Sequence, residues 1–313
     1  MSKVRILFLG TPDFAAESLR RLIEDDHFEI VGVVSQPDRP AGRKMQLKAS
    51  PVKELALAHG LRVMTPETVN TDEFRAEIKA LGAEGAAVVA FGQILGQKFL
   101  DLFPKKAVNV HGSILPRWRG AAPIQRAVMA GDAETGVTLQ IIVRKLDAGP
   151  VLGERRMALP EDMNAMELHD RLKVLGADLL HVEFMDYLRG NLHAVEQDES
   201  QVTHAAKIEK SETQIDWTKS ASEVHNRVRG LQMGPYAWAN LFSQNLKIHK
   251  TRVSSKSMSG SPGDHSVIDE NGTTFIRVVC GSGAVDILEL QPESRARMAV
   301  ADFVRGLRAG EKK

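Results

Sequence analysis

The segment 108–116 (Val-Asn-Val-His-Gly-Ser-Ile-Leu-Pro) carries the residue types best suited to chemistry in this 313-residue chain. Asn109 and His111 stand two positions apart in a predicted strand, so their side chains lie on one face. Asparagine is uncommon in buried strands because its amide must find several hydrogen-bond partners. The pair indicates either a reactive site or two polar side chains that satisfy loop backbone, and by itself it leaves both interpretations open.

Asp147 is the acidic residue that completes such a site. It stands in Leu-Asp-Ala-Gly-Pro, shortly after a strand predicted over residues 137–143. A carboxylate beside a histidine can orient the ring and stabilise its protonated form. Taken alone, an aspartate before Ala-Gly-Pro is most often a turn residue. Together with Asn109 and His111, however, it favours a catalytic group.

The loop after His111 suits a flat ligand such as a heterocycle, or an anion, because it turns tightly and offers backbone N–H and C=O groups. It consists of Ser113, Ile114, Leu115 and Pro116. The chain then runs into Arg-Trp-Arg-Gly-Ala-Ala-Pro (117–123), whose small residues permit close backbone approach. Each arginine of that segment is interpreted as a solvated charge.

The net charge is only +1, from 41 lysines and arginines against 40 acidic residues. As an average, this argues against a nucleic-acid partner. The positive charges are not evenly spread, however, because three stretches are rich in them and nearly free of acids: 39–53, 105–126 and 217–263. The first of these is a long predicted loop, for which the alternative is a mobile, solvated segment. Cations of this kind can contact the phosphates of a nucleic acid.

The elements that position these residues alternate along the first 160 residues between short apolar strands and amphipathic helices. Such alternation predicts an α/β, Rossmann-like domain with a mostly parallel sheet, in which ligands bind at the carboxyl ends of strands. A long helix is predicted over residues 165–188, followed by a polar linker over 191–206. Short strands separated by Asn-Gly and Gly-Ser-Gly turns then predict a small antiparallel, OB-like β-barrel.

Several classes of site are absent from the sequence. It has no G-x-G-x-x-G fingerprint after the first strand, no Walker loop and no nucleophile elbow. Cys280 is the single cysteine, which excludes an intramolecular disulfide and indicates a packing residue. His169 and His181 lie in the long helix without the spacing to acids that a metal site would need, so no metal is expected.

Residues 108–125, which continue the first motif through Arg-Trp-Arg-Gly-Ala-Ala-Pro-Ile-Gln, resemble the signature of the folate-dependent formyltransferases. The resemblance covers nearly the whole chain, through segments 36–43, 131–138, 215–217 and 288–292. Two departures are visible. Ile114-Leu115 stands where the family usually has two leucines, and Gly96 follows Ile94-Leu95 where the family commonly has proline.

The resemblance implies a formyltransferase domain over residues 1–190, a linker over 191–206 and a tRNA-binding barrel over 207–313. It implies that 10-formyltetrahydrofolate is the donor substrate and that the acceptor is the α-amine of methionine esterified to initiator tRNA. Asn109 and a protonated His111 would stabilise the oxyanion, Asp147 would hold the histidine and help to move a proton, and residues 113–116 would cradle the pterin.

The same resemblance extends to the partners. The residues expected to contact tRNA are Arg39, Arg43, Lys44, Lys48, Arg227, Arg229, Lys247, Lys250 and Arg252. We further expect a monomer that acts in the cytoplasm, without a membrane partner.

Two other functions use parts of the same pattern. Formyl transfer to a small amine, such as a purine precursor or an amino sugar nucleotide, would need the same three residues, but the basic C-terminal part favours tRNA. A non-catalytic folate- or RNA-binding module would have no need for Asn109, His111 and Asp147 together.

Overall fold

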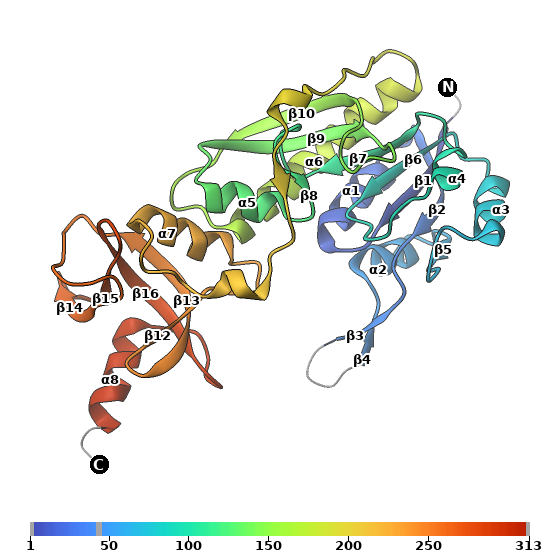
Figure 1. Ribbon diagram of the computed structural model, residues 1–313. Coiled ribbons are helices and arrows are strands. Elements are labelled where there is room, and N and C mark those ends of the chain that lie inside the picture. Colours follow the sequence, from blue (N-terminus) through green and yellow to red (C-terminus); the bar gives the residue numbers. More distant parts are fainter. Residues whose placement is uncertain (1–2, 42–45, 311–313) are drawn as a thin grey trace. The chain divides into compact units, whose positions relative to one another are not determined.

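The computed structural model describes residues 3–41 and 46–310 of the chain, which divides into two compact units (Figure 1). The first unit comprises Met1–Gly120, Thr135–Met157 and His169–His204. The second comprises Ala121–Glu134, Ala158–Leu168 and Ala205–Lys313. The sequence placed the first domain over 1–190, so two short segments, 121–134 and 158–168, belong to a different unit from the one expected.

The first unit is built on a seven-stranded sheet with the strand order β10-β9-β7-β6-β1-β2-β5. Its strands are β1 (Val4–Gly10), β2 (Phe28–Val34), β5 (Val63–Met64), β6 (Gly85–Val89), β7 (Ala107–His111), β9 (Glu134–Ile141) and β10 (Val151–Ala158). The pairs β1–β2, β1–β6, β2–β5 and β6–β7 are parallel, which confirms the mostly parallel sheet.

The helices of this unit include the one expected over residues 165–188, and two others begin at a capping side chain. They are α1 (Asp13–Ile23), α2 (Pro51–Ala58), α3 (Asp72–Ala80), α4 (Gln97–Leu100) and most of α6 (Ala165–Leu188). Ser50 accepts a hydrogen bond from the Lys53 N–H, and Thr71 accepts one from the Phe74 N–H. Each such cap stabilises its helix by about 1 kcal/mol.

Strand β9 corrects one expectation of the sequence analysis. The strand expected over 137–143 ends at Ile141 and runs antiparallel to β7, so that Asn109 lies opposite Gln140 and His111 opposite Thr138. The carboxyl end of β9 therefore lies beside the start of β7, at the edge away from His111. Asp147 reaches the histidine only because the loop 142–150 turns back along the sheet.

Gly149 makes this return possible. A Cβ atom at residue 149 would lie 1.7 Å from the carbonyl oxygen of Ile141, so only glycine fits the approach. The Ile141 N–H in turn donates to the Pro150 carbonyl at 2.9 Å, which fixes the end of the loop against β9. The sequence indicated a turn here but not the close backbone contact that requires the glycine.

The basic stretch after β2 contains a small hairpin. β3 (Arg39–Ala41) pairs antiparallel with β4 (Gln46–Lys48), with Arg39 opposite Lys48. The sequence predicted an irregular loop for this segment. The residues between the two strands, 42–45, lie outside the described residues.

The second unit contains a six-stranded antiparallel sheet in the order β12-β13-β16-β15-β14, with β17 paired to β16. The strands are β12 (Trp238–Leu241), β13 (Gln244–Val253), β14 (His265–Glu270), β15 (Thr273–Val279), β16 (Ala284–Pro292) and β17 (Met298–Ala299). The helices are α5 (Pro123–Ala130), α7 (Ala221–Gly230) and α8 (Val300–Gly310). The sheet confirms the small antiparallel domain expected from the sequence, and among the described residues its outer strands β12 and β14 are not hydrogen-bonded to each other.

Both units have their own hydrophobic core. In the first, Leu7, Leu9, Val88 and Phe99 belong to one buried cluster, and in the second Val228, Ile248, Ile276 and Cys280 belong to another. Burial of each such large side chain contributes about 1.5–3 kcal/mol. None of the helices that the structure describes has the length and apolar character needed to cross a membrane.

We expect Gly149→Ala to lower the free energy of unfolding by about 2–4 kcal/mol, because the loop must move away from Ile141. Urea denaturation followed by circular dichroism measures this change. Gly306→Ala is the matched control, since a Cβ atom there meets nothing within 4 Å in α8. Equal stabilities of the Gly149 variant and the wild type would contradict the tight return of the loop.

We also expect the Cys280 thiol to be unreactive in the folded protein. The side chain is 4% exposed, and burial raises the pKa of its thiol to about 11. Because the thiolate is the reactive form, titration with an aromatic disulfide reagent at pH 8 should label it slowly in buffer and rapidly in denaturant. Rapid labelling of one thiol in the native protein would refute this.

Candidate active site

The structure brings Asn109, His111 and Asp147 together at the end of β7. His111 is 5% exposed, and its Nδ1 lies 3.7 Å from an Asp147 carboxylate oxygen, Oδ2. On the other side of the ring, Nε2 donates to the Trp118 carbonyl at 2.8 Å. Asn109 occupies the same face of β7 and is half-buried, and its side-chain amide has no hydrogen-bond partner among the described residues. That amide is therefore available to a ligand.

Asp147 is held rigidly by donors on both carboxylate oxygens. Oδ2 accepts from the Gly120 N–H at 2.9 Å, and Oδ1 accepts from Gln140 Nε2 at 3.0 Å. Asp147 itself has a φ of +50°, a left-handed conformation that a non-glycine residue adopts at some cost. The carboxylate is thus positioned by its surroundings rather than by a flexible turn.

Gln197 fixes the backbone around Asp147. Its Nε2 donates to the carbonyls of Asp147, at 2.9 Å, and of Gly149, at 2.7 Å. Its Oε1 accepts two hydrogen bonds from Arg119, from Nε at 3.0 Å and from Nη2 at 2.7 Å. The segment that supplies Gln197 was predicted only as a polar linker, and its composition carries no signal for this role.

Arg119 corrects a second expectation, since it is not a solvated charge. It is 2% exposed and also binds Glu199, at 2.8 Å. Hydrogen bonds from Arg119 and Lys145 lower the pKa of the Glu199 carboxyl to about 2. The Gln197 amide oxygen and the Glu199 carboxylate accept from Nε and Nη2, whereas Nη1 is buried without a hydrogen-bond partner among the described residues. Through Gln197, the guanidinium supports the loop that carries Asp147.

The loop expected to cradle a heterocycle uses several of its polar groups internally. The Ser113 hydroxyl donates to the Arg117 carbonyl at 2.6 Å, and the Leu115 N–H donates to the Thr138 hydroxyl at 3.1 Å. That hydroxyl in turn donates to the Ser113 carbonyl at 2.8 Å. Ile114 and Pro116 are partly exposed. The loop is therefore a rigid wall fixed to β9, and its apolar side chains are its accessible parts.

A cavity of about 300 Å³ lies beside the same strand. Its apolar lining comes from α4 and the residues that follow it, from the start of β7 and from the end of β9, and includes Leu100, Phe103, Ala107 and Ile142. Ala107 is two residues before Asn109, and Ile142 begins the loop to Asp147. Polar residues, among them Gln97, Asp101, Lys105 and Arg144, line it as well, and it lies at the edge of the sheet away from His111.

Two basic residues of the first unit are placed where a large ligand can reach them. Arg39 and Lys48 face each other across the β3–β4 hairpin and are exposed. Arg39 makes an exposed ion pair with Glu67 at 3.3 Å, a contact that contributes little to stability. Arg43 and Lys44, also expected to contact tRNA, lie outside the described residues.

In the second unit, Arg229 corrects another expectation. It is 5% exposed, and its Nη1 donates to the Met163 carbonyl at 2.9 Å. Burial lowers the pKa of its guanidinium. Arg229 therefore holds the segment 158–168 against α7 and is not available to a nucleic acid. Arg227 is half-buried and donates to the Glu212 carbonyl at 2.6 Å.

Strand β13 presents the remaining three expected cations. Lys247, Lys250 and Arg252 are all exposed, although a spacing of three would place the first two on opposite faces of a regular strand. The register between β13 and β16 shifts between Ile248 and Lys250, where an extra residue interrupts the alternation. This irregularity explains why all three reach the surface.

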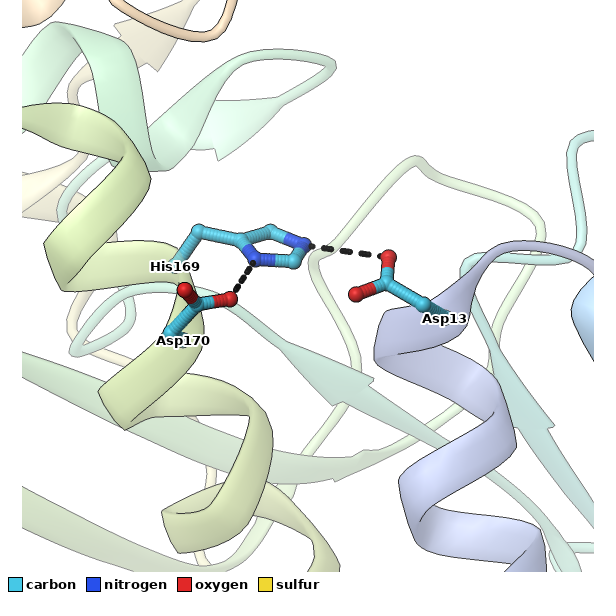
Figure 2. A group of neighbouring side chains, drawn as sticks. All are labelled: Asp13, His169 and Asp170. Atoms are coloured by element: carbon cyan, nitrogen blue, oxygen red, sulfur yellow. Dashed lines mark hydrogen bonds and ion pairs between the residues drawn. The ribbon is translucent and has the colours of Figure 1, made fainter.

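A histidine and two acids come together in the first unit, which the sequence did not indicate (Figure 2). His169 lies between Asp13, at 3.7 Å from Nε2, and Asp170, at 3.1 Å from Nδ1. Lys173 Nζ binds both carboxylates, at 3.1 and 3.4 Å. Because the lysine supplies the positive charge and the acids contact opposite sides of the ring, we interpret the cluster as an ion-pair network.

Residues 3–182 match the formyl transferase family, and residues 207–308 match the formyl transferase C-terminal domain. The methionyl-tRNA formyltransferase of Bdellovibrio bacteriovorus is 56% identical over 310 residues, 98% of this chain and 96% of the relative. That of Bradyrhizobium diazoefficiens is 45% identical over 314 residues, 99% of each chain.

Solved structures show the same fold at low identity. A sugar 3N-formyl transferase, WlaRD, has a TM-score of 0.69 at 15% identity and covers 95% of this chain and 100% of its own. An N-formyltransferase from Helicobacter canadensis has a TM-score of 0.68 at 17% identity, covering 93% and 100%. From the two family matches and the near full-length relatives, the chain belongs to the formyl transferase family.

Proposed function

We propose that this protein transfers the formyl group of 10-formyltetrahydrofolate to the α-amine of methionine on initiator tRNA. The observation that carries the proposal is the likeness to methionyl-tRNA formyltransferases over nearly the whole chain, including the second unit. The placement of Asn109, His111 and Asp147 in one cluster supports it, because formyl transfer needs both oxyanion stabilisation and proton movement.

The chemistry follows from the positions of the three side chains. The neutral amine of the acceptor attacks the formyl carbon, and negative charge develops on the formyl oxygen. The amide of Asn109 donates a hydrogen bond to that oxygen, which lowers the barrier. A protonated His111 donates a second one when its Nε2–H exchanges the Trp118 carbonyl for the formyl oxygen, while Nδ1 stays against Asp147. The bond between the formyl carbon and the folate nitrogen then breaks, and the new bond between that carbon and the acceptor nitrogen remains.

Asp147 has the positioning role in this scheme. Its carboxylate faces His111 Nδ1 and is fixed by Gly120 and Gln140, so it keeps the ring in one orientation. It also accepts the proton that leaves the attacking nitrogen, and the leaving folate nitrogen is protonated in turn. The 3.7 Å between Oδ2 and Nδ1 is longer than a hydrogen bond, so the two groups interact there through their charges.

We place the heterocycle of the donor at the carboxyl end of β7, against the rigid wall of residues 113–116, and not in the cavity at the start of that strand. Two large apolar side chains, Ile94 and Leu146, are 86% and 70% exposed on the loops that follow β6 and β9. Exposed apolar side chains of this size are typical of surfaces that a ligand covers. Polar groups of the loop backbone orient the ring, and apolar contacts hold it.

The tRNA is bound through exposed cations on both units, according to the same proposal. Arg39 and Lys48 lie on the β3–β4 hairpin, and Lys247, Lys250 and Arg252 lie on β13. Phosphate contacts of this kind position a nucleic acid without reading its sequence. A monomer and a cytoplasmic location remain predictions.

We expect Asn109→Ala and His111→Ala each to lower kcat by about 100- to 1,000-fold, because each removes one donor to the oxyanion. Steady-state formyl-transfer assays measure the change, and circular dichroism with thermal melting checks the fold. Asn191→Ala and His193→Ala are matched controls, since these residues are exposed in the same unit. Near-normal turnover of a folded His111→Ala protein would reject the catalytic assignment.

We expect formylation of methionyl initiator tRNA to be much faster than that of methionyl elongator tRNA or free methionine. The phosphate contacts hold a tRNA-borne amine near Asn109, so free methionine should react slowly. Phosphates do not report sequence, so the preference between the two tRNAs is expected from the proposed acceptor and not from these contacts. Rates with the three acceptors at equal concentration test this. Equal rates would exclude tRNA specificity, and faster transfer to an amino sugar nucleotide would favour the small-amine alternative.

A further inference from the structure

Arg252, Asp286 and Arg277 form one row across three neighbouring strands of the second unit. In the registers of β13 with β16 and of β16 with β15, Arg252 lies opposite Asp286 and Asp286 lies opposite Arg277. Arg252 Nε donates to Asp286 Oδ2 at 3.0 Å. Arg277 donates to the same carboxylate twice, to Oδ1 at 2.7 Å and to Oδ2 at 3.1 Å.

The three side chains differ sharply in exposure. Asp286 is 1% and Arg277 6% exposed, whereas the Arg252 side chain is 48% exposed. Both guanidinium carbons also lie over the ring of Phe275, at 4.9 Å for Arg252 and 5.2 Å for Arg277. Arg252 is thus attached at its inner side to a buried acid and a buried aromatic ring, while its outer side faces solvent.

The terminal nitrogens of Arg252 are the unused part of this network. They have no hydrogen-bond partner among the residues that the structure describes. A guanidinium anchored through Nε and a ring keeps its two terminal nitrogens in a fixed plane, which is the geometry that binds a phosphate with two hydrogen bonds. Less conformational entropy is lost on binding than with a free arginine.

The charges of the network leave an excess at the surface. Two arginines face one carboxylate, so the row carries one net positive charge, and Arg252 is its exposed member. The nearby Lys256 and Glu270 form an ion pair with each other and add no net charge. Lys250, exposed on the same strand, adds a second cation beside Arg252.

We propose that Arg252 is a preorganised clamp for a backbone phosphate of the tRNA, and that Asp286, together with Phe275, is the group that positions it. The inference rests on the proposed function and deepens it. It distinguishes one arginine that its neighbours hold in position for a phosphate from the other cations, which are only exposed. Arg277 completes the site because it neutralises the charge of Asp286. Without Arg277, Asp286 would cancel the positive charge of Arg252.

Arg297 offers a matched comparison within the same unit. It also donates through Nε to a carboxylate, that of Glu289, at 2.6 Å, and its side chain is 50% exposed. Glu289, however, is 32% exposed, and among the described residues no second arginine bonds to it, although Lys250 lies opposite it on β13. The acid that holds Arg297 is therefore solvated and not buried, so Arg297 is not fixed in place and is not expected to bind phosphate as tightly.

The test is the KM for methionyl-tRNA and kcat of Arg252→Gln and Arg297→Gln, measured over a series of salt concentrations. For Arg252→Gln we expect KM to rise roughly fivefold at low salt with kcat unchanged. Its log–log dependence of KM on salt should become shallower by about 0.7–0.9, the loss of one phosphate contact. Arg297→Gln should match the wild type in both respects.

Two further variants test the positioning role. Arg252→Lys keeps the charge but not the planar fork, so its KM should stay raised while its salt dependence returns to that of the wild type. Asp286→Asn raises the net charge by one, so charge alone predicts a lower KM, whereas loss of positioning predicts a higher one. If Asp286→Asn does not fold, Arg252→Lys decides the question.

Identical KM values and salt dependences for Arg252→Gln and Arg297→Gln would overturn the inference while leaving the proposed function intact. A lower KM for a folded Asp286→Asn protein, or a wild-type KM for Arg252→Lys, would overturn the positioning role. A wild-type protein that formylates no tRNA would overturn the proposed function, and the inference with it.

Discussion

The antiparallel pairing of β7 with β9 is the constraint on which the candidate site depends. It places Gln140 opposite Asn109 and Thr138 opposite His111, so one strand supplies both the donor to Asp147 and the hydroxyl that fixes the 113–116 loop. It also sends the end of β9 away from the histidine, and the chain must therefore return along the sheet to deliver Asp147. That return requires a backbone contact only glycine permits, at Gly149.

The second feature is a pair of buried arginines, each of which holds a loop or a short segment in place. Arg119 connects Gln197 and Glu199 to the loop of Asp147, and Arg229 attaches the 158–168 segment to α7. Desolvating a guanidinium costs several kcal/mol unless acceptors surround it, so each arginine is found where carbonyls or carboxylates converge. Both side chains thereby act on backbone geometry and not on ligands. The cations of the β3–β4 hairpin and of β13 differ from these two arginines because their side chains are accessible to solvent.

Much of the fold could be predicted from residue patterns. The β-branched runs and the turn residues predicted most strands and helices of the first unit, because these signals act over a few neighbouring residues. β10 and the β3–β4 hairpin were missed, since their residues are polar and carry no clear alternation. The candidate site was predicted in part. Asn109 and His111 share a strand, so their common face follows from spacing alone, whereas Gln140 and Gln197 carry no local signal of their roles.

The sequence by itself determined the α/β class, the pairing of Asn109 with His111 on one face and the uneven distribution of positive charge, because each depends on neighbours in the chain. Only the tertiary structure decided which residues are accessible and what they contact. Arg229 and Arg252 are both arginines in one basic stretch, yet one is buried against carbonyls and the other is exposed above Asp286. The difference arises from contacts with segments that are distant in the sequence. Which side chain loses water, and which acceptors it then meets, depends on how those segments pack in the folded chain.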